Sequence, residues 1–279
     1  MTTRSIIDSS FYSFDQRSAS LGSERLGESP QYIKWSTDIH ERDTPIFFTD
    51  IRLRDVLKFK DIDAPKIAWL LEPPWKPGHY DVTRQLESHF DYILTYWRDF
   101  MRGDKYLWYP IGGSWIAPVN HLPRDCNKTQ LVSMMISEKI AAPGHRMRRN
   151  IYNQYPDIDY YGRAIKPITS KRTALDPYMY QIVVESQSLP SYFTEKIIDC
   201  FTQRVIPIYH GDPTICDRFD CDGILRFDTL GELDAILLSI NERDYADRFT
   251  AIENNARLAP EYFCAEDWLV SHYPFLFKE

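Results

Sequence analysis

Short apolar runs alternate with stretches of helical periodicity along most of this chain, and this alternation restricts its fold more than any other feature. Short, mainly apolar runs that stop at Pro, Gly or acidic residues predict buried strands. They occur at residues 45–49, 66–71, 91–96, 106–109, 130–136, 159–162, 181–185, 205–209 and 224–227. Strands that alternate with helices are typical of parallel βαβ units, so the predicted fold class is α/β.

The intervening periodic segments predict helices, and a polar segment predicts the division into domains. Helices are expected at residues 51–58, 79–89, 145–154, 193–203, 230–241, 244–255 and, at the C-terminus, 267–277. No element is predicted in the first forty or so residues, which are polar and weakly periodic. The Pro- and Asn-rich segment from Trp115 to Lys128 predicts a linker. We therefore expect two α/β domains, 1–125 and 126–279, and leave open whether the last helix packs back on the first.

Composition excludes several functional classes. The 279 residues carry 33 Lys and Arg against 40 Asp and Glu, a net charge of 33 − 40 = −7. Such a chain is a poor general binder of nucleic acid, so any use of positive charge should be local. The sequence predicts neither a transmembrane segment nor a secretory signal. The cysteines are odd in number and lack a Cys-x-x-Cys pair, which predicts reduced thiols in a cytoplasmic protein. Zinc binding by Cys216 and Cys221 with His210 is disfavoured by the ligand spacing.

One segment carries the strongest chemical signal. A predicted strand ends at Glu185, and after a polar loop Ser191 is a suitable N-cap for a helix whose first turn contains Glu195 and Lys196. Lysine opposes the helix dipole there unless an anion docks on the free N–H groups. This pattern indicates a phosphate or diphosphate site. The alternative is an ordinary capping carboxylate and a solvated lysine.

The same segment resembles a known enzyme family. The strings Glu185-Ser186, Tyr192-Phe-Thr-Glu-Lys-Ile-Ile-Asp199 and Val205-Ile-Pro-Ile-Tyr-His-Gly211 resemble the hallmark of the α1,3/1,4-fucosyltransferases, glycosyltransferase family 10. The resemblance extends upstream to Met134–Ser137, His145–Tyr152 and Asp159–Arg163, and into the first domain at Trp69–Trp75. The resemblance is strong over residues 130–230 and weak before residue 65.

The resemblance implies a GT-B architecture, with two Rossmann-like domains facing a cleft, and inverting transfer of L-fucose from GDP-fucose to a hydroxyl of a glycan acceptor. Arg148 and Lys196 match the cations that hold the donor diphosphate. Glu185, Tyr192 and Glu195 match donor-binding positions, and Glu72 matches the proposed general base. Ser186 stands where the family usually has Asn near the sugar. Neither a metal nor a cofactor besides the donor substrate is expected.

Each of these residues also has a simpler interpretation. Glu72 could be a solvated loop carboxylate, and Tyr192 could only pack at the entry to a helix. Glu185 could accept hydrogen bonds from its own loop, and Arg146 could replace Arg148 as the phosphate ligand. Asp50 and Asp199 are interpreted as structural. Two other functions stay open: a transferase for another nucleotide sugar, because of Ser186, and a non-catalytic nucleotide-sugar binding protein.

Overall fold

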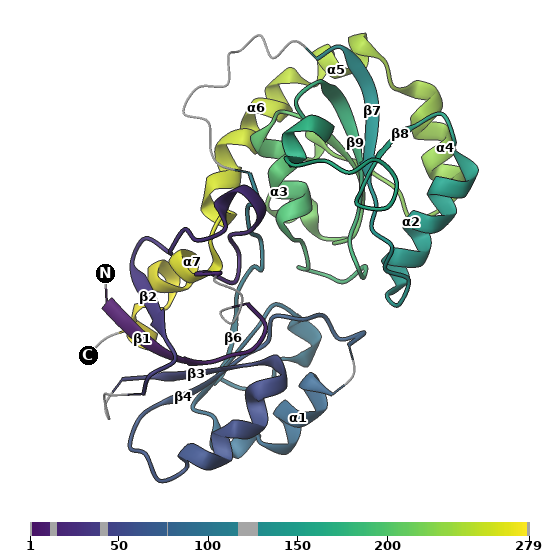
Figure 1. The fold of residues 1–279 in the computed structure, drawn as a ribbon. Coiled ribbons are helices and arrows are strands. Elements are labelled where there is room, and N and C mark those ends of the chain that lie inside the picture. The colour runs from purple at the N-terminus through teal and green to yellow at the C-terminus, as the bar shows by residue number, and fades with distance from the viewer. Residues whose placement is uncertain (1, 12–15, 40–43, 77, 117–127, 278–279) are drawn as a thin grey trace. The chain divides into compact units, whose positions relative to one another are not determined.

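The chain divides into two compact units, each built on one parallel sheet (Figure 1). The computed structural model describes residues 2–11, 16–39, 44–76, 78–116 and 128–277. Unit 1 comprises residues 1–113 and 264–279, and unit 2 comprises residues 114–263. The predicted boundary at 125/126 falls outside the described residues. The observed division comes earlier, between Gly113 and Ser114, and the C-terminal segment joins unit 1.

Unit 1 contains a six-stranded parallel sheet in the order β2-β1-β3-β4-β5-β6. Its strands are β1 (Thr2–Ile7), β2 (Ile33–Ser36), β3 (Ile46–Thr49), β4 (Lys66–Trp69), β5 (Tyr92–Thr95) and β6 (Tyr106–Trp108). The four strands predicted from residue 45 onward are therefore confirmed, with slightly shorter bounds. β1 and β2 had no sequence signal, because the buried polar residues Arg4 and Ser5 interrupt the apolar pattern of β1.

Apolar side chains are buried on both faces of the unit 1 sheet. Along β3, Ile46 and Phe48 point to a cluster that also contains residues of a 3-10 helix, Asp50–Phe59, and of α1 (His79–Gln85), which is followed by a 3-10 turn at Glu87–His89. Phe47 points to the other face, where it meets Trp35 and Trp69. The alternation along a strand explains this two-sided burial. The helix predicted at 51–58 is thus present, but with 3-10 rather than α geometry.

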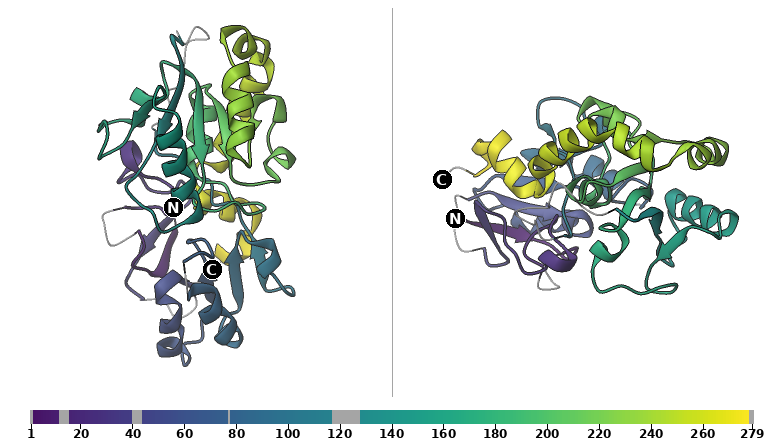
Figure 2. Two further views of the ribbon diagram at one scale, coloured as in Figure 1. Left: turned by 90° about the vertical axis from the view of Figure 1, so that its right-hand side faces the viewer. Right: turned by 90° about the horizontal axis from the view of Figure 1, so that it is seen from above.

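The C-terminal helix α7 (Ala265–His272) belongs to unit 1, next to its purple strands (Figures 1 and 2). Its Glu266 is fully buried and accepts hydrogen bonds from the Ala19 N–H at 2.6 Å and the Ser18 hydroxyl at 2.8 Å. The Trp35 indole N–H donates to the same carboxylate at 3.3 Å. A buried carboxylate with several donors fixes the return of the chain, because leaving it unpaired would cost several kcal/mol.

Unit 2 contains a five-stranded parallel sheet in the order β11-β10-β9-β7-β8. Its strands are β7 (Gln130–Met135), β8 (Asp159–Tyr161), β9 (Tyr178–Val184), β10 (Ile206–His210) and β11 (Leu225–Arg226). Its helices are α2 (Pro143–Gln154), α3 (Glu195–Thr202), α4 (Leu230–Ser239), α5 (Glu242–Asp247) and α6 (Phe249–Leu258). The helix predicted at 244–255 is therefore two helices, and the Asn241 side chain caps α5.

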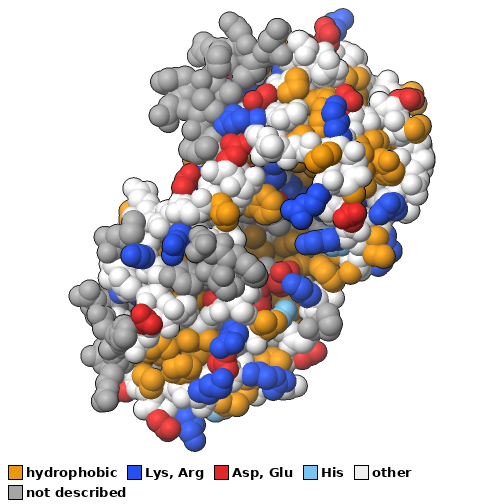
Figure 3. Space-filling view, viewed as in Figure 1, with side chains coloured by type: hydrophobic (Ala, Val, Ile, Leu, Met, Phe, Trp, Pro, Cys, Tyr) orange, Lys and Arg blue, Asp and Glu red, His pale blue; other side chains and the backbone are white. Residues whose placement is uncertain are grey.

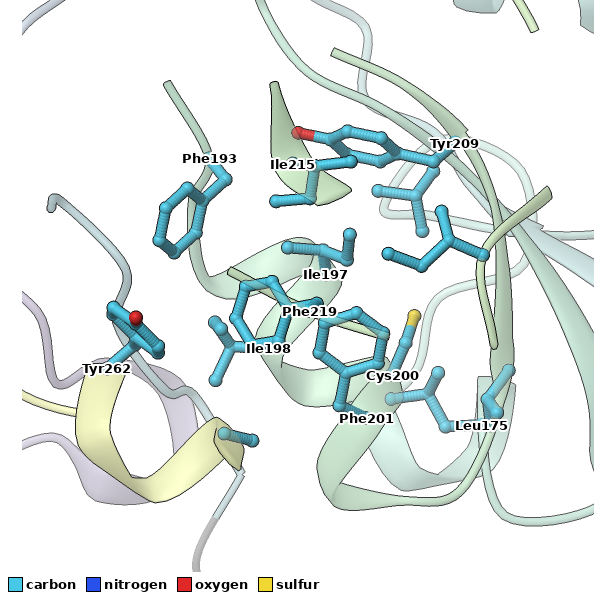
Figure 4. Packing of buried hydrophobic residues seen from close by; sticks show 14 of the residues in the cluster. Leu175, Phe193, Ile197, Ile198, Cys200, Phe201, Tyr209, Ile215, Phe219 and Tyr262 are labelled. Atoms are coloured by element: carbon cyan, nitrogen blue, oxygen red, sulfur yellow. The ribbon is translucent and has the colours of Figure 1, made fainter. Parts of the chain in front are cut away.

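Alternate residues of β9 face opposite sides of the unit 2 sheet. Val183 packs with Tyr209 and with Ile197 and Phe201 of α3, as Figure 4 shows for the residues labelled there. Ile182 and Val184 belong to the cluster on the other side, which includes residues of α2 and α4. Figure 1 shows α3 and α2 on opposite sides of β9. The apolar character of β9 on both faces is what a parallel sheet between helical layers requires.

The two sheets share one topology. In each unit the second strand lies on one side of the first strand, and the third and later strands lie on the other. The direction of the connections therefore reverses between β1 and β3 in unit 1 and between β7 and β9 in unit 2. Ligands of such sheets bind at this switch point, outside the carboxyl ends of the strands. The topology thus directs attention to the ends of β3 and β9.

The cysteine prediction was wrong for one pair. Cys216 and Cys221 form a disulfide, with their Cα atoms 5.1 Å apart, within the range that a disulfide spans. The prediction of reduced thiols was wrong here because two consecutive short 3-10 turns bring together these cysteines, which are five residues apart in the sequence. Cys200 and Cys264 are free and buried, and Cys126 lies outside the described residues. Every helix in the described ranges is too short or too polar to cross a bilayer.

Candidate functional site

The start of α2 lies against the end of β9 at the switch point of unit 2. The Gly144 N–H donates to the Ser186 carbonyl at 2.9 Å. A Cβ atom at Gly144 would come 1.7 Å from the carbonyl oxygen of Glu185, so only glycine allows this approach. Gly144 was not among the residues predicted from the sequence, although Pro143-Gly144 at a helix start was a usable signal.

Arg148 follows on the same helix and is 7% exposed. Its Nε donates to the Val184 carbonyl at 3.0 Å, and Nη2 donates to the same oxygen. Nη1 has no hydrogen-bond acceptor among the described residues. Arg146 and Arg149 are exposed, and Arg146 donates to the Ala141 carbonyl on its own helix entry. Of the three arginines in this cluster, Arg148 is therefore the one held at the unit 2 edge, the edge of the sheet at which its parallel strands end.

Thr194, rather than Ser191, is the N-cap of α3. Its hydroxyl accepts from the Lys196 N–H, and its backbone is extended, as capping requires. Ser191 has a φ of 66° and its N–H donates to the Asp212 carboxylate at 2.8 Å, so it belongs to the preceding loop. Glu195 and Lys196 occupy the first turn as predicted.

Glu185 connects the end of β9 to the start of α3. Its carboxylate is fully buried and accepts from the Thr194 N–H at 2.9 Å and from the Lys196 ammonium at 3.0 Å. Lys196 also donates to the Thr194 hydroxyl at 2.7 Å, and its side chain is 28% exposed. Glu185 thus accepts hydrogen bonds from its own segment, as its simpler interpretation expects, while its predicted contact with the donor stays a prediction. Lys196 is not a solvated lysine, and an anion arriving here has to share its ammonium with Glu185.

Glu195 is stabilised as an anion by two lysines. Burial acts to raise the pKa of its carboxyl, but Lys196 and Lys171 outweigh that effect and lower the pKa to about 2. The Lys171 ammonium lies 3.5 Å from Glu195 and 2.7 Å from the buried carboxylate of Asp199. No sequence pattern singled out Lys171, which lies in a 3-10 helix (Lys171–Ala174) before β9 and contacts α3 only in the tertiary structure. Asp199 is structural, as predicted, since it also accepts from the Trp115 N–H.

Charge at this edge is local and internally paired. Three cations, Arg148, Lys171 and Lys196, lie among Glu185, Glu195 and Asp199. On the face shown in Figure 3, basic and acidic side chains of the described residues are intermixed rather than gathered into one basic field. Within the described part of the chain, no three His, Cys, Asp or Glu residues are grouped to hold a metal ion.

Three further side chains, those of Ser186, Tyr192 and His145, complete the edge. The Ser186 and Tyr192 hydroxyls are hydrogen-bonded at 2.8 Å, and Tyr192 is 4% exposed. His145 accepts from the Ala142 N–H through Nδ1. Burial, together with Arg148, Lys139 and Lys196, lowers the pKa of His145 to about 4. This imidazole is therefore neutral at pH 7, with its proton on Nε2.

Glu72 lies in unit 1, three residues beyond the end of β4, whereas the residues matched to donor binding all lie in unit 2. The side chain of Glu72 is 37% exposed, and its carboxylate pairs with the Lys76 ammonium at 2.8 Å. Asp50 follows β3, is 2% exposed, and accepts from the backbone N–H groups of Leu71 and Glu72 at 3.0 and 3.3 Å. Burial raises the pKa of Asp50 to about 7, although both N–H groups act to lower it.

Known proteins resemble this chain in fold. No protein-family model and no curated protein matches the chain. Among solved structures, an alpha1,3-fucosyltransferase is similar over 99% of this chain and 90% of its own, with 15% identity and a TM-score of 0.62. The alpha1,3-fucosyltransferase with GDP-fucose gives 15% identity and a TM-score of 0.60, over 100% and 90% of the two chains. A structure described as trehalose-6-phosphate from E. coli bound with UDP-2-fluoro glucose gives 12% identity and 0.55, over 86% and 74%. These matches establish the GT-B fold of the chain.

Proposed function

We propose that this chain is a glycosyltransferase that moves L-fucose from GDP-fucose to a hydroxyl of a glycan acceptor, with inversion at the anomeric carbon. The observation that carries the proposal is the start of α3 at the unit 2 switch point, where Lys196 is backed by buried Glu185. The GT-B fold supports the class of reaction, since a similar structure is described as an alpha1,3-fucosyltransferase with GDP-fucose. The family motif around Glu195 and Lys196 supports the choice of donor.

The donor diphosphate would bind where cations and a helix terminus meet. Arg148 is anchored through Nε and Nη2, so Nη1 is the group available to a phosphate oxygen. Lys196 and the positive end of the α3 dipole add positive charge at that edge. When the bond from fucosyl C1 to the phosphate oxygen breaks, its electron pair passes to GDP. Groups that meet this growing negative charge stabilise the transition state more than the ground state.

The acceptor needs a base. In the proposed reaction the acceptor oxygen bonds to C1 on the face opposite the departing GDP, and its proton passes to Glu72. The partly exposed carboxylate of Glu72 is accessible for that role, whereas Asp50 is buried. GDP leaves as a stable anion, so the proposed chemistry uses no metal. Transfer activity is therefore expected to persist in EDTA.

A specific observation favours a second candidate donor. The Ser186 hydroxyl bonds to Tyr192, and serine is shorter than the asparagine usual in the family. A different pocket for the sugar would result, so another nucleotide sugar on the same scaffold is the alternative. The remaining hypothesis for the same site is that the chain binds a nucleotide sugar without catalysing transfer.

Calorimetric titration with GDP-fucose, GDP-mannose and UDP-glucose, followed by a transfer assay on a glycan array, tests the proposal. We expect tighter binding of the GDP sugars than of UDP-glucose, and transfer of fucose to at least one glycan. Equal or tighter binding of UDP-glucose would end the fucosyl proposal. GDP-mannose transfer would select the second donor, and donor binding without any transfer would select the binding protein.

A further inference from the structure

The switch point of unit 1 holds a second buried carboxylate, which the proposed reaction does not use. Asp50 directly follows β3 and has a φ of 34°, a left-handed conformation that is uncommon outside glycine. Its carboxylate accepts from the Ser10 hydroxyl at 3.3 Å, and Ser10 in turn donates its N–H to Asp8, which follows β1. A non-glycine residue held in this conformation and buried is a feature that surrounding contacts must enforce.

Asp50 bonds directly to the backbone that carries Glu72. β4 ends at Trp69, so the N–H groups of Leu71 and Glu72 lie beyond that strand, and Oδ1 of Asp50 accepts both. The Glu72 side chain extends from this anchored backbone and is 37% exposed. The Asp50 carboxylate is therefore inside the fold, and the Glu72 carboxylate is accessible to substrate. A single hydrogen bond joins the Asp50 carboxylate to the backbone N–H of Glu72.

We propose that Asp50 is a positioning residue for Glu72. Asp50 fixes the loop that carries the Glu72 carboxylate, and its negative charge helps to draw the acceptor proton toward that carboxylate. This inference rests on the proposed role of Glu72. Two effects follow from the geometry. The hydrogen bonds hold the backbone of Glu72 in one place, which a general base requires. A negative charge on Asp50 attracts the acceptor proton as it moves to Glu72, so proton transfer becomes easier.

The second effect depends on pH. Burial raises the pKa of Asp50 to about 7, so its charge develops as the pH rises through neutrality. The titratable groups that face it are Glu72 and Lys76 after β4, His79 and Tyr80 of α1, Tyr109 after β6, and Asp8 after β1. Burial and the charge of Lys76 lower the pKa of His79, so that imidazole is neutral at pH 7 and does not produce the same transition.

A double-mutant cycle tests the proposal with the full-length chain, GDP-fucose and the best glycan from the array. Asp50→Ala should lower kcat about tenfold or more, while the dissociation constant for GDP changes less than about twofold. In the Glu72→Gln background the same substitution should have almost no further effect on kcat. Asp91→Ala is the matched control. The exposed Asp91 carboxylate also accepts a hydrogen bond from a backbone N–H of this sheet, but that of Lys66, at the edge where the strands begin. This control should leave kcat unchanged.

Asp50→Asn keeps the shape, tolerates the left-handed conformation and removes the charge, so it separates folding from electrostatics. The ratio of wild-type kcat to Asp50→Asn kcat should be near one at pH 5.5 and should rise as the pH passes 7. A constant ratio, or an Asp50→Ala effect that persists in full without Glu72, would assign Asp50 a purely structural role and overturn the inference. Absence of any transfer by the wild-type chain would instead overturn the proposed function.

Discussion

Both units place a buried carboxylate immediately after the third strand of a sheet with the same topology, yet the two carboxylates differ in their partners. Asp50 follows β3 and Glu185 follows β9. Glu185 accepts from the ammonium of Lys196 and from the cap of α3. Asp50 accepts from two backbone N–H groups and one hydroxyl, and burial raises its pKa to about 7.

The difference shows that topology selects the position and the partner decides the chemistry. The carboxylate of Glu185 is paired with a cation and holds that cation in place. In the described structure Asp50 accepts only from neutral donors, and burial brings its pKa close to neutral pH. The unit 2 edge is therefore suited to hold an anion through fixed cations, and the unit 1 edge is suited to proton chemistry. The following predictions test this contrast.

The largest expected effect is on transfer by Glu72→Gln. Removal of a general base typically costs a factor of about 10²–10⁴, and the variant should bind GDP-fucose as the wild type does because unit 2 is unchanged. Initial rates and calorimetry on the same preparations measure the two quantities. Full transfer activity would remove Glu72 from the proposed mechanism and with it the assignment of proton chemistry to the unit 1 edge.

The two buried carboxylates should respond with opposite sign to neutralisation. The folded-state pKa of Asp50, about 7, lies above its ordinary value of 3.8, so its protonated form contributes stability below pH 4 that is lost as the pH rises through 7. Asn is neutral throughout. Asp50→Asn should therefore gain up to about 4 kcal/mol of unfolding free energy relative to wild type between pH 4 and pH 8.

Glu185→Gln is the comparison for that measurement. It should lose about 1–3 kcal/mol at pH 8, because the Lys196 ammonium then lacks its charged acceptor. Denaturant unfolding at several pH values gives both numbers. If both variants shift in the same direction at pH 8, the contrast between the two edges is wrong.

The smallest expected effect is on donor affinity. Lys196→Ala should weaken GDP binding about tenfold to a hundredfold, because one charge-assisted hydrogen bond contributes about 1.5–3 kcal/mol. Arg146→Ala is the matched control, since this exposed cation of α2 contacts only its own helix entry in the described structure. Its GDP affinity should change less than about twofold. Similar losses in both variants would indicate general charge attraction rather than a site at α3.

The sequence alone predicted the fold class, most strands and the first turn of α3. Apolar runs of strand length are local signals, so the strands from residue 45 onward were found within a few residues. The apolar pattern failed to predict β1, where polar residues are buried. The periodic pattern did not distinguish 3-10 from α geometry in the helix after β3, because that choice depends on packing. The N-cap was misassigned because Ser191 and Thr194 are both good caps, and only the loop conformation separates them.

What the sequence determined by itself is the order of elements and the chemical types available, because periodicity and capping act over a few neighbouring residues. The tertiary structure decided the partners. Lys171 meets Glu195 across 24 positions, Glu266 meets Ser18 across the whole chain, and Asp50 meets the backbone of Glu72 only because β3 and β4 are neighbours. Such contacts join residues far apart in sequence, and their energies depend on burial, which no local pattern records.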